Sequence, residues 1–168
     1  MSKYNSWSKE RLITEIKQLK KTTYGLLWDD KPEDVAELCK TKLPVLVDVE
    51  DKEISGDAHG PVNILIEGDN YHALSVLNYT HKGKIDFIYI DPPYNTGAKD
   101  WKYNNAFVDA QDPYRHSKWL SFMEKRLKFA KNLLTDRGII CVTIDDYEMP
   151  RLWMLMDKIF DESNHLGT

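Results

Sequence analysis

One stretch of the sequence, residues 85–97, restricts the fold more than any other, and it reads IDFIYIDPPYNTG. Its first six residues are mostly β-branched or aromatic, which is typical of a buried strand. Two prolines follow Asp91, and because proline has no backbone N–H, neither a helix nor a strand ladder continues through them. The sequence therefore predicts a strand that stops abruptly and leaves Asp91 at its carboxyl end.

The turn after this strand carries groups that suit one kind of ligand. Pro92 and Pro93 keep the backbone extended, so the carbonyls of Asp91 and Pro92 have restricted directions and no regular partner. Tyr94 adds a flat aromatic ring. Two oxygens that accept from an exocyclic amine, beside a ring that stacks, suit a base turned out of its duplex. The alternative is a plain Pro-Pro turn whose aspartate caps a helix or faces solvent.

A second acidic turn precedes this strand. Residues 62–67 (VNILIE) predict another buried strand, Gly68-Asp69-Asn70 form a turn, and residues 71–79 predict a helix. With the strand at 85–90 this makes a βαβ unit, whose parallel strands present their carboxyl ends at one edge. Asp69 and Asp91 are then expected in one shared site. Alternatively, Asp69 or Asn70 caps the helix, and both roles are compatible if Asn70 caps while Asp69 binds.

These segments resemble a known family. Asp91-Pro92-Pro93-Tyr94 matches the D/N-P-P-Y/F signature of amino-methyltransferases that act on adenine N6 or cytosine N4 of DNA. The longer string YIDPPYNTG resembles the adenine-specific group with permuted motif order (the beta class), which includes the modification subunits of type III restriction-modification systems. ILIEGDN and RGIICVTIDDYE are similar to flanking segments of the same family. The resemblance spans roughly residues 20–168.

The resemblance implies a fold and a site. The fold is a partial Rossmann-like α/β domain that uses S-adenosylmethionine, with a mostly parallel sheet flanked by helices. Asp91 and the Pro92 carbonyl would accept from the N6 amine of adenine, Pro93 would hold the turn, and Tyr94 would stack on the flipped base. Asp69, with Gly68, Asn70 and Asp91, would bind the cofactor. The implied partners are double-stranded DNA and a second copy, a C-terminal subunit or a restriction subunit; no metal is needed.

The N-terminal third reads as an attachment to this domain. Residues 8–21 predict a helix with Ser8 as its N-cap, either packed on the domain or used as a subunit contact. A short helix is predicted over 32–42 and a strand over 43–49. Residues 51–61 hold two glycines, a proline and three acids, which predicts a linker. We therefore expect a helical attachment over 1–60 and the catalytic domain over 61–168.

The C-terminal half continues with alternating elements. Residues 114–135 predict the strongest helix, ended by Gly138, followed by a strand at 139–144 and a helix at 147–160. The basic residues of the helix at 114–135 predict a solvated face, or alternatively a stripe that faces phosphates. Asp145 and Asp146 are expected to cap the last helix. Residues 98–113 predict a long loop next to the site, and the resemblance implies that this loop closes over cofactor and base. Its Trp101, Tyr103 and Phe107 are given no individual roles.

Composition limits the function classes. The chain has 168 residues and a net charge of −4, enough for one core but without an evident surface for grasping DNA. It has no apolar run near the roughly 18 residues of a membrane span. Cys39 and Cys141 lack metal-ligand spacing, so reduced thiols of a cytoplasmic protein are expected. No glycine-rich cofactor loop occurs, so we expect an N-terminal portion that carries only the acceptor half of the site.

Two other functions remain open from the sequence. Asp69, Asp91 and Asp145 follow predicted strands, and three carboxylates at neighbouring strand ends would suit a magnesium-dependent phosphodiesterase or nuclease. That hypothesis leaves the Pro-Pro-Tyr sequence unexplained. The other alternative is an inactive methyltransferase remnant that binds a partner subunit.

Overall fold

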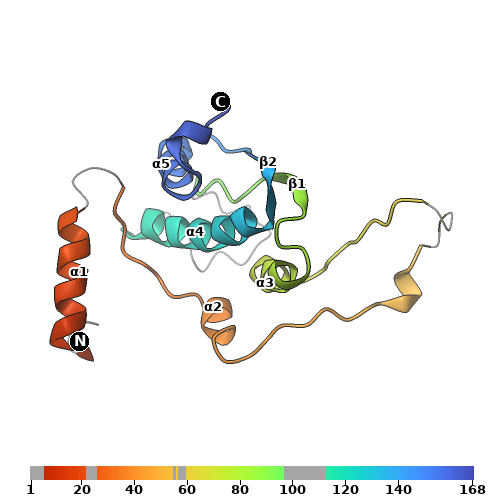
Figure 1. Cartoon of the computed structure of the whole chain (residues 1–168), viewed down its shortest axis with the longest axis horizontal. Coiled ribbons are helices and arrows are strands. Elements are labelled where there is room, and N and C mark those ends of the chain that lie inside the picture. The colour runs from red at the N-terminus through yellow and green to blue at the C-terminus, as the bar shows by residue number, and fades with distance from the viewer. Residues whose placement is uncertain (1–5, 22–25, 55, 57–59, 97–112) are drawn as a thin grey trace.

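The computed structural model describes residues 6–21, 26–54, 56, 60–96 and 113–168. It is a mixed structure of helices and strands with a small parallel sheet (Figure 1). The helices are α1 (Lys9–Lys21), α2 (Asp34–Leu38), α3 (Asn70–Thr80), α4 (Arg115–Leu133) and α5 (Met149–Phe160), with 3-10 turns η2 (Glu50–Lys52) and η3 (Glu162–Asn164). The strands are β1 (Ile85–Ile90) and β2 (Leu134–Val142).

The parallel pair is built from β1, α4 and β2. The two strands run in register from Phe87 opposite Ile139 to Ile90 opposite Val142. Parallel strands need a crossover between them, and α4 lies on that connection. The predicted strand at 85–90 and the helices at 71–79, 114–135 and 147–160 are confirmed within one to two residues at each end.

Two predicted strands are wrong. Residues 43–49 and 62–67 are extended in the structure but pair with no strand in the part of the chain described. Val45 and Leu65 are 74% and 95% exposed. A β-branched composition only fits a half-buried, pleated surface and does not supply the neighbouring strand whose hydrogen bonds hold it. The expected βαβ unit through residues 62–90 is therefore replaced by the unit through β1, α4 and β2.

The core lies between α4 and α5. Leucines and aromatic residues spaced three or four apart on α4 meet a similar stripe on α5. The buried members are Trp119, Leu120, Met123, Leu127, Leu152, Leu155 and Ile159. Ile90 and Ile140 pack against this cluster from one face of the sheet, whereas Phe87 and Tyr89, which alternate with them on β1, are each 59% exposed. The core thus fixes the carboxyl ends of both strands.

The prediction that Gly138 ends α4 is wrong, because Gly138 lies within β2. The helix ends at Leu133, and Leu134 is already extended. The register shifts between Ile85 and Phe87, so β2 bulges over the residues before Ile139. A Cβ on Gly138 would lie 2.9 Å from the Ile85 carbonyl oxygen. Glycine is needed here because the two backbones approach closely.

The N-terminal helix α1 forms as predicted, and Ser8 Oγ accepts from the Arg11 amide at 3.3 Å. Ile13 and Ile16 of its apolar stripe are not packed, since they are 41% and 50% exposed, and α1 stands apart from α4 and α5 in Figure 1. α2 is shorter than the predicted 32–42. Among the described residues no helix is both long and apolar enough to cross a membrane, and both cysteines are free thiols.

Candidate active site

Asp91 leaves the sheet directly after the last ladder bond of β1. The Thr143 amide donates to the Ile90 carbonyl at 3.0 Å, and the next residue along β1, Asp91, then lies beside Thr143. The Thr143 hydroxyl donates to Asp91 Oδ1 at 2.7 Å. This hydrogen bond is the main cause that lowers the pKa of Asp91 below its ordinary value, and a second hydrogen bond from Tyr94 adds to it. Asp91 is therefore an exposed, ionised acceptor at neutral pH.

The Pro-Pro-Tyr turn is held from α4. The indole Nε1–H of Trp119 donates to the Pro93 carbonyl at 2.6 Å, whereas the Pro92 carbonyl has no hydrogen-bond partner among the residues described. Tyr94 is half-buried, and its hydrogen bond to Asp91 raises the pKa of its phenol. The tyrosine is thus a neutral donor whose hydroxyl lies at the Asp91 carboxylate. Among the described residues, the turn therefore presents an exposed carboxylate and a carbonyl oxygen without a partner, and their binding of a base stays a prediction.

A buried polar network follows Tyr94, and sequence reasoning missed it. Asn95 is fully buried with a left-handed backbone, at φ 59°. Its Nδ2 donates to Glu148 Oε1 at 2.5 Å. His116 Nδ1 lies 2.6 Å from the same oxygen, and Glu148 is also fully buried. The preference of asparagine for the left-handed region was the one signal in the sequence that marked position 95.

The Gly68-Asp69-Asn70 turn opens α3, and Asp69 caps this helix while Asn70 does not. Asp69 is the N-cap, and its Oδ1 accepts from the Tyr71 amide at 2.8 Å. Asn70 does not cap; its Oδ1 accepts from Arg126 Nε at 2.7 Å. Asp69 has the side chain that the backbone of the first turn requires, so the capping alternative is confirmed for it. Its side chain is 41% exposed.

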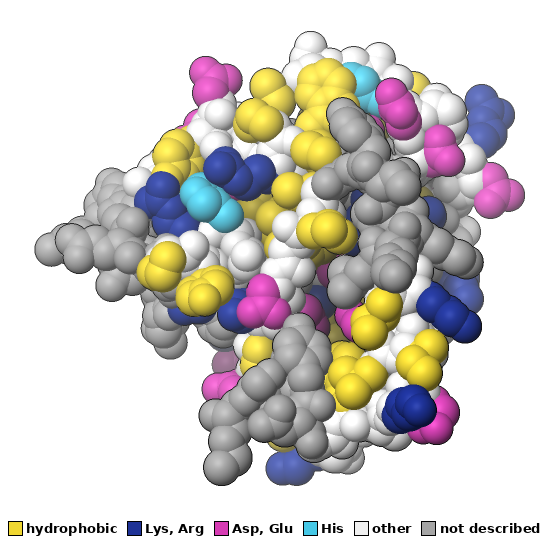
Figure 2. Space-filling view, turned by 90° about the vertical axis from the view of Figure 1, so that its left-hand side faces the viewer, with side chains coloured by type: hydrophobic (Ala, Val, Ile, Leu, Met, Phe, Trp, Pro, Cys, Tyr) yellow, Lys and Arg dark blue, Asp and Glu magenta, His cyan; other side chains and the backbone are white. Residues whose placement is uncertain are grey.

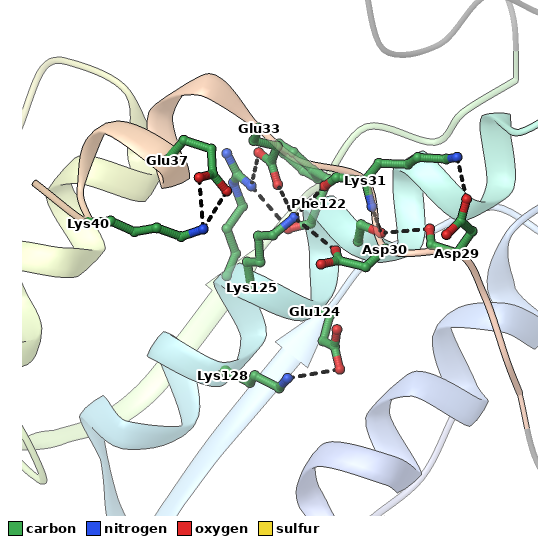
Figure 3. A network of polar contacts seen from close by, with 12 residues as sticks. Asp29, Asp30, Lys31, Glu33, Glu37, Lys40, Phe122, Glu124, Lys125 and Lys128 are labelled. Atoms are coloured by element: carbon green, nitrogen blue, oxygen red, sulfur yellow. Dashed lines mark hydrogen bonds and ion pairs between the residues drawn. The ribbon is translucent and has the colours of Figure 1, made fainter. Parts of the chain in front are cut away.

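Arg126 joins this turn to α2, which corrects the prediction that the basic residues of α4 form a solvated face. The arginine is 8% exposed and donates to Glu33 Oε2 at 2.8 Å. Lys125 is also turned inward and donates to the Lys31 carbonyl at 2.7 Å, as Figure 3 shows beside Glu33. Lys128 does fit the prediction: it is 61% exposed and pairs with Glu124 at 2.9 Å. Of these three cations of α4, Lys125 and Arg126 therefore anchor the helix and Lys128 is solvated.

The three carboxylates proposed for magnesium do not gather. Asp145 Oδ1 accepts from the Tyr147 amide at 3.0 Å in the turn before α5. The prediction that Asp145 and Asp146 cap α5 is wrong, because the N-cap of this helix is Glu148 and no side chain caps it. Asp69 and Asp91 have the separate partners described above. No group of three His, Cys, Asp or Glu residues in the described ranges could hold a metal ion. The phosphodiesterase hypothesis thus lacks its ligand cluster in this part of the chain.

The surface offers no continuous basic area on the face drawn in Figure 2. Lys and Arg side chains there occur in small groups separated by hydrophobic and acidic ones. This agrees with the overall charge of −4. The predicted loop over the site, with Trp101, Tyr103 and Phe107, lies outside the described residues.

Comparison with known proteins identifies the family. Residues 85–168, which contain the Asp91 turn and the core, match the N6_N4_Mtase family, described as DNA methylase. The probable type III restriction-modification enzyme HindVI Mod subunit of Haemophilus influenzae is 50% identical over 105 residues, covering 62% of this chain and 13% of that protein. The type II methyltransferase M.KpnI of Klebsiella pneumoniae is 48% identical over 101 residues, covering 60% of this chain and 24% of that protein.

A third relative matches nearly the whole chain. The type III restriction-modification enzyme EcoP15I Mod subunit of Escherichia coli is 31% identical over 194 residues, covering 98% of this chain. The chain spans only 30% of that relative's length, and smaller shares of the other two. The matched region begins with β1 and contains both strands, α4 and α5. The chain therefore belongs to the DNA methylase family of N6 and N4 amino-methyltransferases.

Proposed function

We propose that this chain forms the base-accepting part of a DNA methyltransferase of a restriction-modification system. The reaction is transfer of a methyl group from S-adenosylmethionine to the N6 amine of an adenine turned out of double-stranded DNA. The observation that carries the proposal is the Asp91 turn: an exposed, ionised carboxylate and an unengaged carbonyl, fixed by β2 and α4. The names of the relatives, which are Mod subunits and a methyltransferase, support the same reaction class.

The chemistry follows from two acceptors on one amine. The adenine N6 nitrogen shares its lone pair with the ring and is a poor nucleophile. When Asp91 and the Pro92 carbonyl accept its two N–H groups, electron density returns to the nitrogen. The nitrogen gains positive charge as the new bond forms, so the interaction with the Asp91 carboxylate strengthens toward the transition state. The lowered pKa of Asp91 suits an electrostatic acceptor better than a general base.

Tyr94 has two compatible tasks in this proposal. Its neutral hydroxyl donates to Asp91 and helps to orient the carboxylate. Its ring is half-buried and offers one face on which a flipped base can stack, a contact that is worth about 1–3 kcal/mol for a base on an aromatic side chain. Asp91, Pro92 and Tyr94 would thus touch the base, while Pro93 holds the turn through its carbonyl.

The cofactor would be held at the Gly68-Asp69-Asn70 turn. Asp69 Oδ1 is used by the Tyr71 amide, and the half-exposed carboxylate keeps a second oxygen that can accept from an adenine amino group. Gly68 has φ 151°, and a Cβ there would meet no atom within 4 Å, so its backbone is accessible. These donors and acceptors fit the adenosine end of S-adenosylmethionine. When bound, the cofactor supplies an electrophilic methyl group.

Three wider features belong to the same proposal. The parallel pair of β1 and β2 would be part of a larger Rossmann-like sheet. Residues 1–60 would be an attachment and residues 61–168 the catalytic region. The partners would be DNA and either a second copy of the protein or a restriction subunit, as the words "Mod subunit" in the names of two relatives suggest.

The test is to identify the methylated nucleoside. The longest natural polypeptide that contains these residues is incubated with methyl-labelled S-adenosylmethionine and plasmid DNA, and the digested nucleosides are separated by mass spectrometry. N6-methyladenine made in the presence of chelator is the expected result. N4-methylcytosine would refute the choice of base. DNA cleavage that needs magnesium, without methylation, would refute the proposal and favour the phosphodiesterase.

A further inference from the structure

We infer that the buried side chains of Asn95, Glu148 and His116, called here the Asn95 network, position the acceptor turn for methyl transfer. The inference rests on the proposed function, because it assigns these residues a part in that reaction. They are positioning residues, since they act through Asp91 and Tyr94 and not on the base itself. The experiments below separate a failure of the network from a failure of the proposed function.

The first step concerns the backbone at Asn95. A left-handed conformation, here at φ 59°, is unfavourable for residues other than glycine and persists only where the surroundings impose it. Asn95 has no exposed surface, and its Nδ2 donates to Glu148 Oε1 at 2.5 Å. Its Oδ1 has no hydrogen-bond partner among the described residues, so within them the contact with Glu148 is the polar attachment of this side chain. Glu148 therefore holds the conformation at the end of the turn.

The second step concerns Glu148. A fully buried carboxylate is unfavourable unless donors surround it, so its donors determine where it lies. His116 lies 2.6 Å away, through Nδ1, and Arg151 Nη1 lies 3.5 Å from the other carboxylate oxygen. Arg115 Nε–H donates to His116 Nε2 at 3.3 Å, so the ring carries its hydrogen on Nδ1 and donates it to Glu148. The network thus has a defined polarity, from α4 through Glu148 to Asn95.

The third step concerns the turn as a whole. It is held at alternate residues: Asp91 by Thr143, the Pro93 carbonyl by Trp119, and Asn95 by Glu148. Two of the groups that would meet the base, the Pro92 carbonyl and the Tyr94 ring, lie between these anchors. Prolines leave few backbone rotations free, so fixing both ends of the turn fixes the direction of the groups between them. Releasing Asn95 frees Tyr94 first and then the Pro93 carbonyl.

A purely structural role predicts something different. Glu148 immediately precedes α5 and accepts nothing from the substrate, so the network could serve only to hold α5 on α4. In that case its loss would lower the unfolding temperature, but the folded protein would keep the turn geometry and its catalytic rate. A reporter inside the turn distinguishes the two roles, and the Trp119 indole, which donates to Pro93, is such a reporter.

The first experiment uses the ¹⁵N-labelled chain and the indole N–H resonance of Trp119, assigned with Trp119→Phe. In Asn95→Asp a second carboxylate faces Glu148, and the left-handed backbone is still tolerated. We expect the resonance to move upfield, as for a weakened hydrogen bond. The matched control is Asn78→Asp, an asparagine of α3 bonded to the Leu74 and Phe129 carbonyls.

The outcomes are distinct. A Trp119 resonance that moves in Asn95→Asp but not in Asn78→Asp supports the inference, and one that moves in neither or in both overturns it. If Asn95→Asp fails to fold, His116→Phe takes its place, because His116 is 29% exposed and its loss removes one donor from Glu148. The expected shift is then smaller and in the same direction, and an unchanged resonance overturns the inference.

The second experiment measures methyl transfer by the longest natural polypeptide containing these residues. Asn95→Asp is expected to lower kcat at least about tenfold, with KM for S-adenosylmethionine within about twofold, because the cofactor turn lies elsewhere. An unchanged kcat, with the Trp119 resonance moved, refutes the positioning role and leaves the proposed function intact. A wild-type protein that transfers no methyl group refutes the proposed function and this role in it, while the resonance still decides whether the network holds the turn.

Discussion

The two acidic turns of this chain are held in different ways. The turn at Asp91 is bonded at three points to β2, α4 and the residue before α5. The turn at Asp69 is held by its own helix, whose Tyr71 amide donates to the Asp69 side chain, and by Arg126 through the neighbouring Asn70. External anchors fix the direction of a carboxylate, whereas capping uses one of its oxygens. A group that must meet a transition state needs the first arrangement, and a group that only binds can work with the second.

The largest expected effect breaks the attachment of the Asp69 turn. Arg126→Ala leaves Glu33 buried, with Lys125 at 3.3 Å as its remaining cation, and removes the donor to Asn70. Loss of one partner from a buried pair costs about 3–5 kcal/mol. We expect the free energy of unfolding, measured by urea denaturation, to fall by an amount near the lower limit of this range. Lys128→Ala, at an exposed pair, is the control and should cost at most about 0.5 kcal/mol. Equal effects would show that the Arg126 contact is not structural.

The next effect removes the carboxylate of the other turn. Asp91→Ala should lower the rate of methyl transfer by about 100-fold or more, as for loss of one preorganised group in other enzymes. Binding of S-adenosylmethionine, measured by calorimetry, should change little if Asp91 acts mainly on the base. Asp86→Ala, at the opposite end of β1, is the control and should retain the rate. A rate within about threefold of wild type in Asp91→Ala would contradict the role given to this turn.

A smaller effect separates capping from binding at Asp69. Asp69→Ala should lower the free energy of unfolding by about 1 kcal/mol through the lost cap and weaken S-adenosylmethionine binding. Asp69→Ser keeps a capping oxygen, since serine is as good an N-cap as aspartate, but has no second oxygen for the cofactor. We expect stability to return in Asp69→Ser while the weakened affinity persists, as calorimetry would detect. If affinity returns together with stability, Asp69 is only a cap.

The smallest effect concerns the ionisation of Asp91. Thr143→Val removes the main hydrogen bond that lowers its pKa, so the pKa should rise toward the ordinary value near ~3.9, as followed by carboxyl ¹³C NMR. Because the pKa of Asp91 is lower in the folded than in the unfolded protein, the ionised carboxylate contributes its full share to the free energy of unfolding above the unfolded pKa. This contribution is lost as the pH falls through the folded pKa. Activity between about pH 5 and 8 should therefore not follow this group.

The control for that titration uses the other end of β1. The Thr135 hydroxyl donates to Asp86 at 3.1 Å, so Thr135→Val removes a similar hydrogen bond far from the turn. The Asp91 titration should be the same in Thr135→Val as in the wild type. A rise in both variants would mean that the sheet as a whole, and not Thr143, determines the pKa of Asp91.

The sequence predicted those parts of the fold whose signal is local. The 3.6-residue period of α4 and the apolar run of β1 were sufficient for both elements, and the two prolines ended β1 correctly. Residues 62–67 have an equally strong strand composition but no partner strand in the described structure. Strand pairing is a relation between two distant segments, so composition alone does not determine it.

In the candidate site, too, the sequence indicated the local features and not the contacts between distant segments. Asp91 and the prolines were visible because their effect is local, and the capping role of Asp69 was one of two stated alternatives. The contacts from Thr143, Trp119 and Glu148 cross between 26 and 53 positions of sequence, and no short pattern encodes such contacts. The strand-end argument that found Asp91 could have found Thr143, which follows β2 in the same way.

The bulge at Gly138 has a consequence for how sequences of this kind can diverge. A methyl group at this position would meet the Ile85 carbonyl at 2.9 Å and Leu134 Cδ2 at 2.8 Å. The neighbouring apolar positions of β2 can exchange one aliphatic side chain for another with little loss. In a library of variants selected for a folded product, position 138 should therefore accept almost no replacement while Ile139 and Ile140 accept several. Gly138, which has no side chain, would then be the residue of β2 that tolerates the fewest substitutions.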